Sequence, residues 1–375
     1  MRLERDGYIR TPQWRAAVEE VPRHEFVRQF FDRVDVSNAP TLWDPTSPER
    51  STIDRWLLLA YKDASHVTQL DGRVAPGDVA GPVEGNPTSS STMPSLVVRM
   101  WEDLEVRDGD RVLEIGTGTG YSAALGCHRL GPDNITSVEF DPGVSERARQ
   151  ALARAGYRPQ LIVGDGEKGS PGRAPYDRII ATCSFRYVPQ AWLEQSKPGT
   201  IILVTLSGWI GATGLVKLTV TGDGSAEGQF LPGYVSFMPS RAHSPEPALI
   251  PDMLGDADTR KTGLGPDVLM TYGPAQLVAQ LALPEAQYIH FGHGGDLPEH
   301  LLVQPDASYA AFTGTAGNWT VRQGGPRRVW DQVERAVEDW HSSGEPRIET
   351  FRVIAAAAEQ RVQILSGHSW RLPSS

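Results

Sequence analysis

Residues 112–122 read Val112-Leu113-Glu114-Ile115-Gly116-Thr117-Gly118-Thr119-Gly120-Tyr121-Ser122, an apolar strand followed by a Gly-x-Gly-x-Gly turn and the start of a helix. Glycine lets the backbone approach a ligand where a Cβ would collide, and the start of a helix presents N–H groups that lack partners in the helix. The spacing differs from the Gly-x-Gly-x-x-Gly of dinucleotide sites, and an acid, Glu114, precedes it. The stretch therefore favours an adenosyl amino acid over a pyrophosphate, although glycine-rich turns also serve simple chain reversal.

Strand and helix patterns alternate on both sides of this turn. The apolar runs predicted as strands are Arg111–Ile115, Ile135–Glu139, Gln160–Val163, Asp177–Ala181 and Thr200–Leu206. The segments predicted as helices between them are Tyr121–Leu130, Gly143–Ala155 and Gln190–Gln195. Such alternation predicts an α/β fold with a Rossmann-like, doubly wound, mostly parallel sheet, whose ligands bind at the carboxyl ends of the strands.

Two further strand ends carry acids. Glu139 closes the second strand 19 residues after Gly120, near the spacing of about 20 at which a carboxylate accepts from ribose hydroxyls. Phe140 could then lie against the adenine face. Asp165 closes the third strand and could accept from the adenine amino group. Taken singly, each acid could also be an exposed strand end or an ordinary turn residue.

Together these features predict S-adenosylmethionine as the cofactor and S-adenosylhomocysteine as the product. The predicted cofactor-binding residues are Glu114, Gly116, Thr117, Gly118, Gly120, Tyr121, Ser122, Glu139, Phe140, Asp165 and Gly166.

A second segment is dense in hydroxyls. It reads Thr88-Ser89-Ser90-Ser91-Thr92-Met93-Pro94 and precedes a predicted helix over Met93–Leu104. Thr92 could cap that helix. Hydroxyl clusters most often serve as caps or solvated loops, so the residues alone assign no chemistry to this segment.

The rest of the chain divides by composition. Residues 1–90 are predicted to form a helical N-terminal part of a domain spanning 1–240, with 75–92 as a loop. Residues 241–285 begin with a stretch rich in Pro, Asp, Gly and Thr and are predicted as a linker or wrap. Residues 286–375 are predicted as a smaller α+β domain: short strands, an amphipathic helix from Pro326 to Gly344, then two more strands.

Composition narrows the function classes. The 375 residues carry a net charge of −10 and no basic run, so neither nucleic acid nor a membrane surface is predicted as a partner. No apolar stretch approaches the roughly 20 residues of a membrane span. The start of the chain lacks the apolar core of a signal peptide. We therefore expect a cytoplasmic protein.

No metal site is predicted. Cys127 and Cys183 are the two cysteines, far apart and without metal spacing. His290 and His293 with Asp296 could suggest a metal, but two histidines three apart near an acid are common without one. Cys183 and Ser184 show no nucleophile-elbow pattern, which disfavours a hydrolase.

At this point the sequence resembles the protein-L-isoaspartate O-methyltransferase family over roughly residues 5–240. The segments that carry the resemblance are Val21–Val27, Ala60–Asp63, Thr88–Pro94, Val112–Ser122, Glu139, Val163–Gly166, Pro175–Asp177, Val188–Gln190, Leu193–Gly199 and Phe237–Pro239. Two departures are conspicuous: Thr92 stands where the family has a serine beside the methyl donor, and Gly199-Thr200 replaces Gly-Gly.

The resemblance implies carboxyl O-methylation, with Thr92 and Ser91 at the reaction and Ser89, Ser90, Thr92 and Ser184 binding the substrate. The tail of about 135 residues after residue 240 resembles extensions of actinobacterial methyltransferases that modify ribosomal peptides of the lanthipeptide type. It favours methylation of an aspartate in such a peptide, leading to succinimide and isoaspartate. The alternative is repair of isoaspartyl residues in proteins. A nicotinamide oxidoreductase and a non-catalytic peptide-binding protein remain open from the residues alone.

Overall fold

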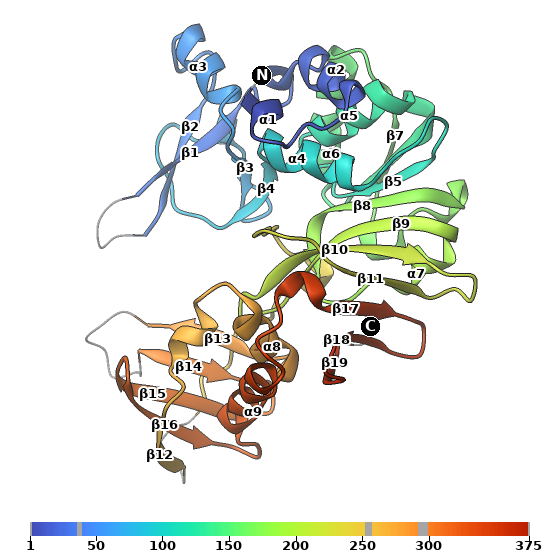
Figure 1. The fold of residues 1–375 in the computed structure, drawn as a ribbon. Helices are drawn as coiled ribbons and strands as arrows, with labels where there is room; N and C mark the ends of the chain where they lie inside the picture. The colour runs from blue at the N-terminus through green and yellow to red at the C-terminus, as the bar shows by residue number, and fades with distance from the viewer. Residues whose placement is uncertain (1, 36–39, 252–256, 292–298, 374–375) are drawn as a thin grey trace. The chain divides into compact units, whose positions relative to one another are not determined.

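The computed structural model describes residues 2–35, 40–251, 257–291 and 299–373, drawn as a ribbon in Figure 1. The α-helices are α1 (Arg2–Arg5), α2 (Pro12–Glu20), α3 (Ile53–Ala60), α4 (Pro94–Asp103), α5 (Tyr121–Leu130), α6 (Pro142–Arg154), α7 (Gln190–Glu194), α8 (Pro274–Ala282) and α9 (Val329–Ser342). The chain folds as two compact units. Unit 1 holds Met1–Thr182 and Ala191–Leu203, and unit 2 holds Cys183–Gln190 and Val204–Ser375.

The strands fall into three groups by position in the chain. The first group is β1 (Phe30–Val34), β2 (Leu42–Thr46), β3 (His66–Leu70) and β4 (Pro87–Ser91). The second is β5 (Val112–Ile115), β6 (Ile135–Glu139), β7 (Gln160–Val163), β8 (Tyr176–Phe185), β9 (Ser196–Ser207), β10 (Thr213–Val220) and β11 (Ala226–Phe230). The third is β12 (Asp258–Thr262), β13 (Gln287–His290), β14 (His300–Val303), β15 (Tyr309–Thr315), β16 (Asn318–Gly324), β17 (Arg352–Ala355), β18 (Gln360–Gln363) and β19 (Ser369–Arg371).

A parallel sheet forms the centre of unit 1. Its strands run in the order β7-β6-β5-β8, and each neighbouring pair is parallel. The chain builds outward from β5 to β7 and then returns to add β8 on the other side of β5. The strand order therefore reverses at β5, where ligands bind in doubly wound folds. The predicted fold class is confirmed.

The starts of α5 and α6, the helices after β5 and β6, are determined by local sequence. α5 starts directly after the glycine turn. Asp141 caps α6, because its carboxylate accepts from the Val144 N–H at 2.9 Å, and Pro142 occupies the first turn, where its missing N–H costs nothing. In Figure 1, α5 lies near β6, and α6 lies along β6 and β7.

The N-terminal part is not simply helical, as residues 1–90 were predicted to be. Between α2 and α4 an antiparallel sheet runs in the order β2-β1-β3-β4. β4 consists of Pro, Thr and Ser, a composition typical of loops. It forms a strand because its hydroxyls are paired on burial: Thr68 of β3 donates to Ser89 of β4 at 3.2 Å, and both residues are buried.

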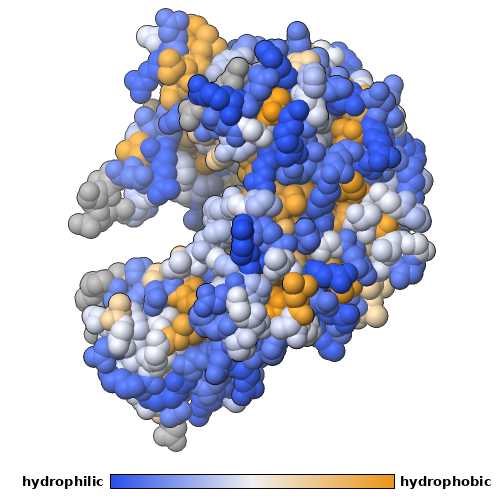
Figure 2. Space-filling model, viewed as in Figure 1, coloured by the Kyte–Doolittle hydropathy of each residue, from blue (hydrophilic) through white to orange (hydrophobic). Residues whose placement is uncertain are grey.

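α3 leaves part of its apolar surface exposed. Trp56 and Ala60 pack against Val27 and Phe30. On the other side, Leu58 is 76% exposed, and Figure 2 shows apolar surface over the region of α3. None of the described helices is long and apolar enough to cross a membrane.

Unit 2 joins segments that were predicted to be separate. Its first sheet continues from the end of β9 through β10, β11, β17, β18 and β19. β11 pairs antiparallel with β17, so that Ala226 faces Ala355. This pairing ties residues before 240 to the end of the chain, and the compact units therefore follow other limits than 1–240, 241–285 and 286–375. The expected linker contains β12 and α8.

The other sheet of unit 2 runs β12-β16-β15-β14-β13. α9, the predicted amphipathic helix, covers β15 and β16, and α8 packs on α9 (Figure 1). Trp330 of α9 meets Phe312 of β15 edge to face, with ring centroids 4.5 Å apart. Arg260 of β12 bridges to Asp331 and Glu334 of α9.

Candidate active site

The glycine turn after β5 adopts a backbone shape that other residues would strain. Gly116, Gly118 and Gly120 have φ angles of 93°, 54° and 88°. A Cβ on Gly118 would lie 3.1 Å from the Ser90 carbonyl oxygen. A hydrogen bond from β8 also fixes the turn: the Thr182 hydroxyl donates to the Gly116 carbonyl at 2.5 Å. These contacts give a narrow, pre-formed cradle open to a ligand.

Glu139 lies at the end of β6 beside this turn. Its Oε2 accepts from the Gly118 N–H at 2.9 Å and its Oε1 from the Asp141 N–H at 3.1 Å. Burial raises the pKa of this carboxyl. Each carboxylate oxygen has two acceptor positions, so the ribose hydroxyls of an adenosyl group could still bind. Phe140 follows with 54% exposure, available to an adenine ring.

Glu114 lies inside the sheet rather than on its rim. It is fully buried, and the Ser137 hydroxyl donates to its Oε2 at 2.6 Å. Burial raises the pKa of Glu114 to about 7. The Ser122 and Ser137 hydroxyls beside it act in the opposite direction and lower the pKa in part. The predicted contact of Glu114 with the cofactor remains a prediction.

Three other predicted cofactor residues support the turn from its buried side. The Thr117 hydroxyl lies 2.7 Å from that of Ser137. Ser122 accepts from the Trp101 indole N–H at 3.0 Å. Tyr121 is buried, and burial raises its pKa to about 12. These side chains position the backbone that would meet the cofactor.

Asp165 follows β7, next along the sheet. Its carboxylate accepts from the Glu167 N–H at 3.0 Å and caps a short turn over Gly166–Lys168. A Cβ on Gly166 would lie 2.5 Å from the Ile115 side chain. Glycine at 166 is therefore required for the end of the third strand to approach the end of the first.

The hydroxyl-rich segment lies directly against the glycine turn. The Thr119 hydroxyl donates to the Ser91 hydroxyl at 3.1 Å, and the Ser90 carbonyl bounds the space at Gly118. Ser89 is buried and bonded to Thr68, whereas Thr92 is only partly buried. The structure thus brings the predicted acceptor segment and the predicted cofactor turn together.

Arg23 was not predicted as a functional residue. Its buried guanidinium donates to three backbone carbonyls, those of Ala60, Ala64 and Thr92, at 2.9, 3.1 and 3.0 Å. It also lies over the Tyr121 ring, 5.0 Å from its centroid. In the sequence, the only sign of a role for Arg23 was its place in the Val-Pro-Arg segment of the family resemblance. A buried arginine requires hydrogen-bond partners, and here three carbonyls provide them.

Ser184 belongs to unit 2, whereas the residues described above belong to unit 1. It is fully buried. Its hydroxyl donates to the Phe237 carbonyl at 3.1 Å and accepts from Ser207 at 2.7 Å. A buried hydroxyl that already bonds on both sides is poorly suited to bind a peptide, and we leave it out of the proposed site.

A pocket of about 260 Å³ adjoins the glycine turn. It is lined by parts of the N-terminal segment, β3, the turn and α6: Glu25, Phe26, Arg28, Gln29, Glu49, Thr68, Ala75, Pro76, Gly118, Thr119, Val144, Arg147, Gln150, Ala151 and Arg154. Of the histidine and acid positions weighed for a metal, His293 and Asp296 lie outside the described residues.

Comparison with known proteins agrees with this geometry. The family profile of protein-L-isoaspartate(D-aspartate) O-methyltransferase matches residues 65–238. The protein-L-isoaspartate O-methyltransferase of Ignicoccus hospitalis is 40% identical over 164 residues, covering 43% of this chain and 76% of that protein. The enzyme of that name from Thermococcus onnurineus is 32% identical over 240 residues, covering 64% and 89%.

The chain belongs to the protein-L-isoaspartate O-methyltransferase family. It is an S-adenosylmethionine-dependent carboxyl methyltransferase. The glycine turn and Glu139 had predicted the cofactor, and the resemblance had implied the carboxyl acceptor. A solved structure described as a protein-L-isoaspartate O-methyltransferase aligns with 97% of this chain and 97% of its own, with a TM-score of 0.55 and 20% identity. The likeness of fold therefore extends through the tail.

Proposed function

We propose that this methyltransferase esterifies the free α-carboxylate of L-isoaspartyl residues in proteins or peptides. The contact of Thr119 with Ser91, which joins the cofactor turn to the acceptor segment, supports methyl transfer at this place. The relatives that match most of their own length carry the isoaspartyl name. An aspartate in a ribosomal peptide was the predicted substrate because of the tail, whereas the relatives support the isoaspartyl alternative better.

The residues fit a reaction that needs alignment more than acid–base chemistry. When bound, S-adenosylmethionine supplies an electrophilic methyl group. A substrate carboxylate is already ionised near neutral pH, so no side chain has to remove a proton. Thr92, with nearby hydroxyls and backbone N–H groups, would orient the carboxylate, while Glu139 and the glycine turn would hold the cofactor. Orientation and exclusion of water then account for the rate.

Apart from Ser184, the predicted acceptor residues have a place in this scheme. The Ser90 carbonyl and the Ser91 hydroxyl face the turn. Ser89 is bonded to Thr68 of β3, and Thr92 is partly buried. The pocket beside Gly118 offers room for a side chain next to the target residue. Arg28, Arg147 and Arg154 line it together with Glu25 and Glu49, so the pocket offers both charge signs to a substrate.

A matched pair of peptides tests the proposal. The two peptides share one sequence and differ only in an L-isoaspartyl or an L-aspartyl linkage at one position. We expect the isoaspartyl peptide alone to accept a methyl group, with S-adenosylhomocysteine formed in step. Methylation of the aspartyl peptide would instead support the ribosomal-peptide alternative, and methylation of neither would count against both. The cytoplasmic location remains a prediction.

A further inference from the structure

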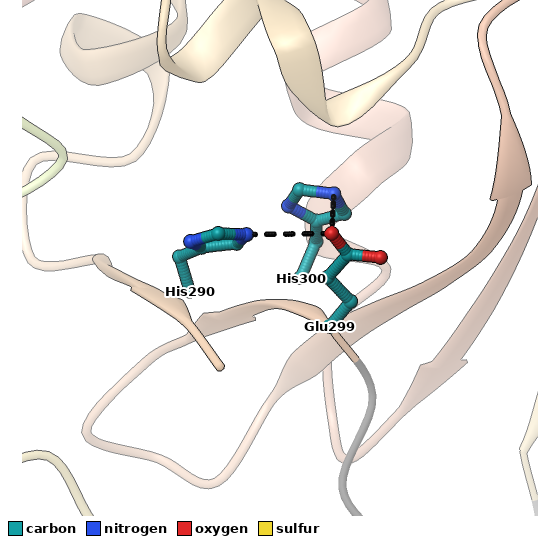
Figure 3. Close-up of side chains that lie close together, drawn as sticks. All are labelled: His290, Glu299 and His300. Carbon is teal, nitrogen blue, oxygen red and sulfur yellow. Dashed lines mark hydrogen bonds and ion pairs between the residues drawn. The ribbon is translucent and has the colours of Figure 1, made fainter. Parts of the chain in front are cut away.

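Outside the methyl-transfer site, His290, Glu299 and His300 form a cluster in unit 2. One nitrogen of each imidazole and one carboxylate oxygen lie within 4.8 Å of one another. Figure 3 shows both rings directed at the same Glu299 oxygen. His290 Nε2 is 3.5 Å from that oxygen, and His300 Nε2 is 3.9 Å from it.

The topology of the hairpin explains why these residues meet. His290 ends β13 and His300 begins β14, and the two are directly paired across the antiparallel strands. Side chains of a direct cross-strand pair lie on one face of the sheet. Their rings are nearly parallel, with centroids 5.0 Å apart. Glu299 lies in a bend just before β14, outside the strict alternation of a strand, so its carboxylate can reach the face of its neighbour.

The surroundings of His300 would support a metal ligand. It is 5% exposed, and its Nδ1 lies 2.6 Å from the Tyr288 hydroxyl. If Nδ1–H donates to the phenol oxygen, Nε2 carries the lone pair that a metal needs. Such a hydrogen bond on the far nitrogen is the usual partner of a metal-binding histidine.

We infer that His290, Glu299 and His300 bind a divalent zinc-type cation. Two imidazoles and one carboxylate are a ligand set that zinc takes with an open fourth position, whereas magnesium and calcium prefer oxygen ligands alone. Ligands of a tetrahedral zinc ion lie about 3.3 Å apart. The observed separations of 3.5 and 3.9 Å from Glu299 need only small side-chain rotations to reach this value. The ion would fasten the ends of β13 and β14 together.

The test is zinc titration of the full-length, untagged chain after treatment with a chelator. Isothermal titration calorimetry should show one zinc ion per chain with a dissociation constant below about 10 µM. Cobalt should give the visible absorption of a four-coordinate site. His290→Ala, Glu299→Gln and His300→Gln should each weaken binding by at least about 100-fold. Zinc should raise the melting temperature of the wild type but not that of His290→Ala.

A control separates this site from ordinary surface pairs. His341, in the last turn of α9, and Glu345, just after the helix, form an exposed histidine–carboxylate pair at 2.8 Å. The control variant His341→Ala should bind zinc as the wild type does. His290 is half exposed, so its alanine variant should fold even if His300→Gln does not. Equal zinc affinity in His290→Ala and wild type would overturn the inference. So would a wild-type dissociation constant above about 10 µM.

Discussion

The Arg23 guanidinium donates to the Thr92 carbonyl at 3.0 Å, although 69 positions separate the two residues. Arg23 is 1% exposed, and burial lowers its pKa to about 10, so it remains charged at neutral pH. One buried cation thus anchors the segment that would orient the substrate carboxylate. Arg23 is a positioning residue, since it reaches the reaction only through Thr92.

Replacing Arg23 should therefore impair alignment more than cofactor affinity. Arg23→Met keeps much of the volume but leaves the carbonyls of Ala60, Ala64 and Thr92 without their donor. We expect kcat for methyl transfer to fall about 100-fold, with a smaller change in the Kd of S-adenosylhomocysteine. Arg23→Lys should recover part of the rate. Equal losses of rate and cofactor affinity would show general collapse of the unit rather than a positioning role.

Glu139 should contribute directly to cofactor affinity. Glu139→Gln replaces a charged acceptor with a neutral one, and hydrogen bonds to charged groups contribute about 1.5–3 kcal/mol. We expect the Kd of S-adenosylhomocysteine to rise roughly ten- to a hundredfold by calorimetry. Glu146→Gln, on the exposed side of α6, is the control and should bind as the wild type does. Unchanged affinity in Glu139→Gln would remove Glu139 from the cofactor site.

The glycine turn allows a test with matched backbone strain. Gly118 has φ of 54° and faces the Ser90 carbonyl, whereas Gly109 has φ of 83° and a Cβ there would meet nothing within 4 Å. Both alanine variants carry the left-handed penalty of about 1–2 kcal/mol. Gly118→Ala alone should also lose cofactor affinity and methyl transfer. If Gly109→Ala lost both equally, strain rather than the cradle would explain the effect.

Two variants at Thr92 test whether activity depends on the hydroxyl or on the shape of this side chain. Thr92→Val keeps the branched shape without the hydroxyl, and Thr92→Ser keeps the hydroxyl. A hydrogen bond of about 1 kcal/mol predicts a roughly fivefold loss of kcat/KM for the isoaspartyl peptide in the valine variant, and near-normal activity in the serine variant. The reverse order would show that packing of the methyl group matters instead.

The raised pKa of Glu114 predicts how the stability of the fold depends on pH. Its pKa rises from 4.5 to about 7 on folding, so the unfolded chain releases this proton at lower pH. Its stabilising contribution is full below pH 4.5 and is lost as the pH rises through 7, at about 1.4 kcal/mol per pKa unit. Glu114→Gln should therefore flatten the fall in melting temperature between pH 5 and pH 8. An unchanged slope in the variant would mean that the carboxyl titrates normally.

The sequence predicted the central sheet because its signals are local. Strand, turn and helix each have their own pattern, and the spacing from Gly120 to Glu139 depends on one strand–helix–strand unit. β4 was missed because its stability comes from Thr68 across the strand pair, which composition does not show. Arg23 was missed as a functional residue because its partners lie 37 to 69 residues away.

The boundaries of unit 2 were not predicted because they also depend on contacts between residues far apart in the sequence. Pairing of β11 with β17 joins residues more than 120 positions apart, as between Ala226 and Ala355. The sequence predicted only part of the cluster in unit 2: His290 was named as a possible metal ligand, but Glu299 and His300 were not. Their approach depends on the register of β13 and β14, which no local pattern contains.

The most direct test of the proposed function is the mass of an isoaspartyl peptide after incubation with the purified chain and S-adenosylmethionine. We predict a gain of one methyl ester, or loss of one water where the ester has closed to a succinimide, and one S-adenosylhomocysteine per event. Glu139→Gln and Thr92→Val should slow this change in the same assay. An unchanged peptide mass with no S-adenosylhomocysteine, from wild-type chain that binds the cofactor, would contradict the proposed function.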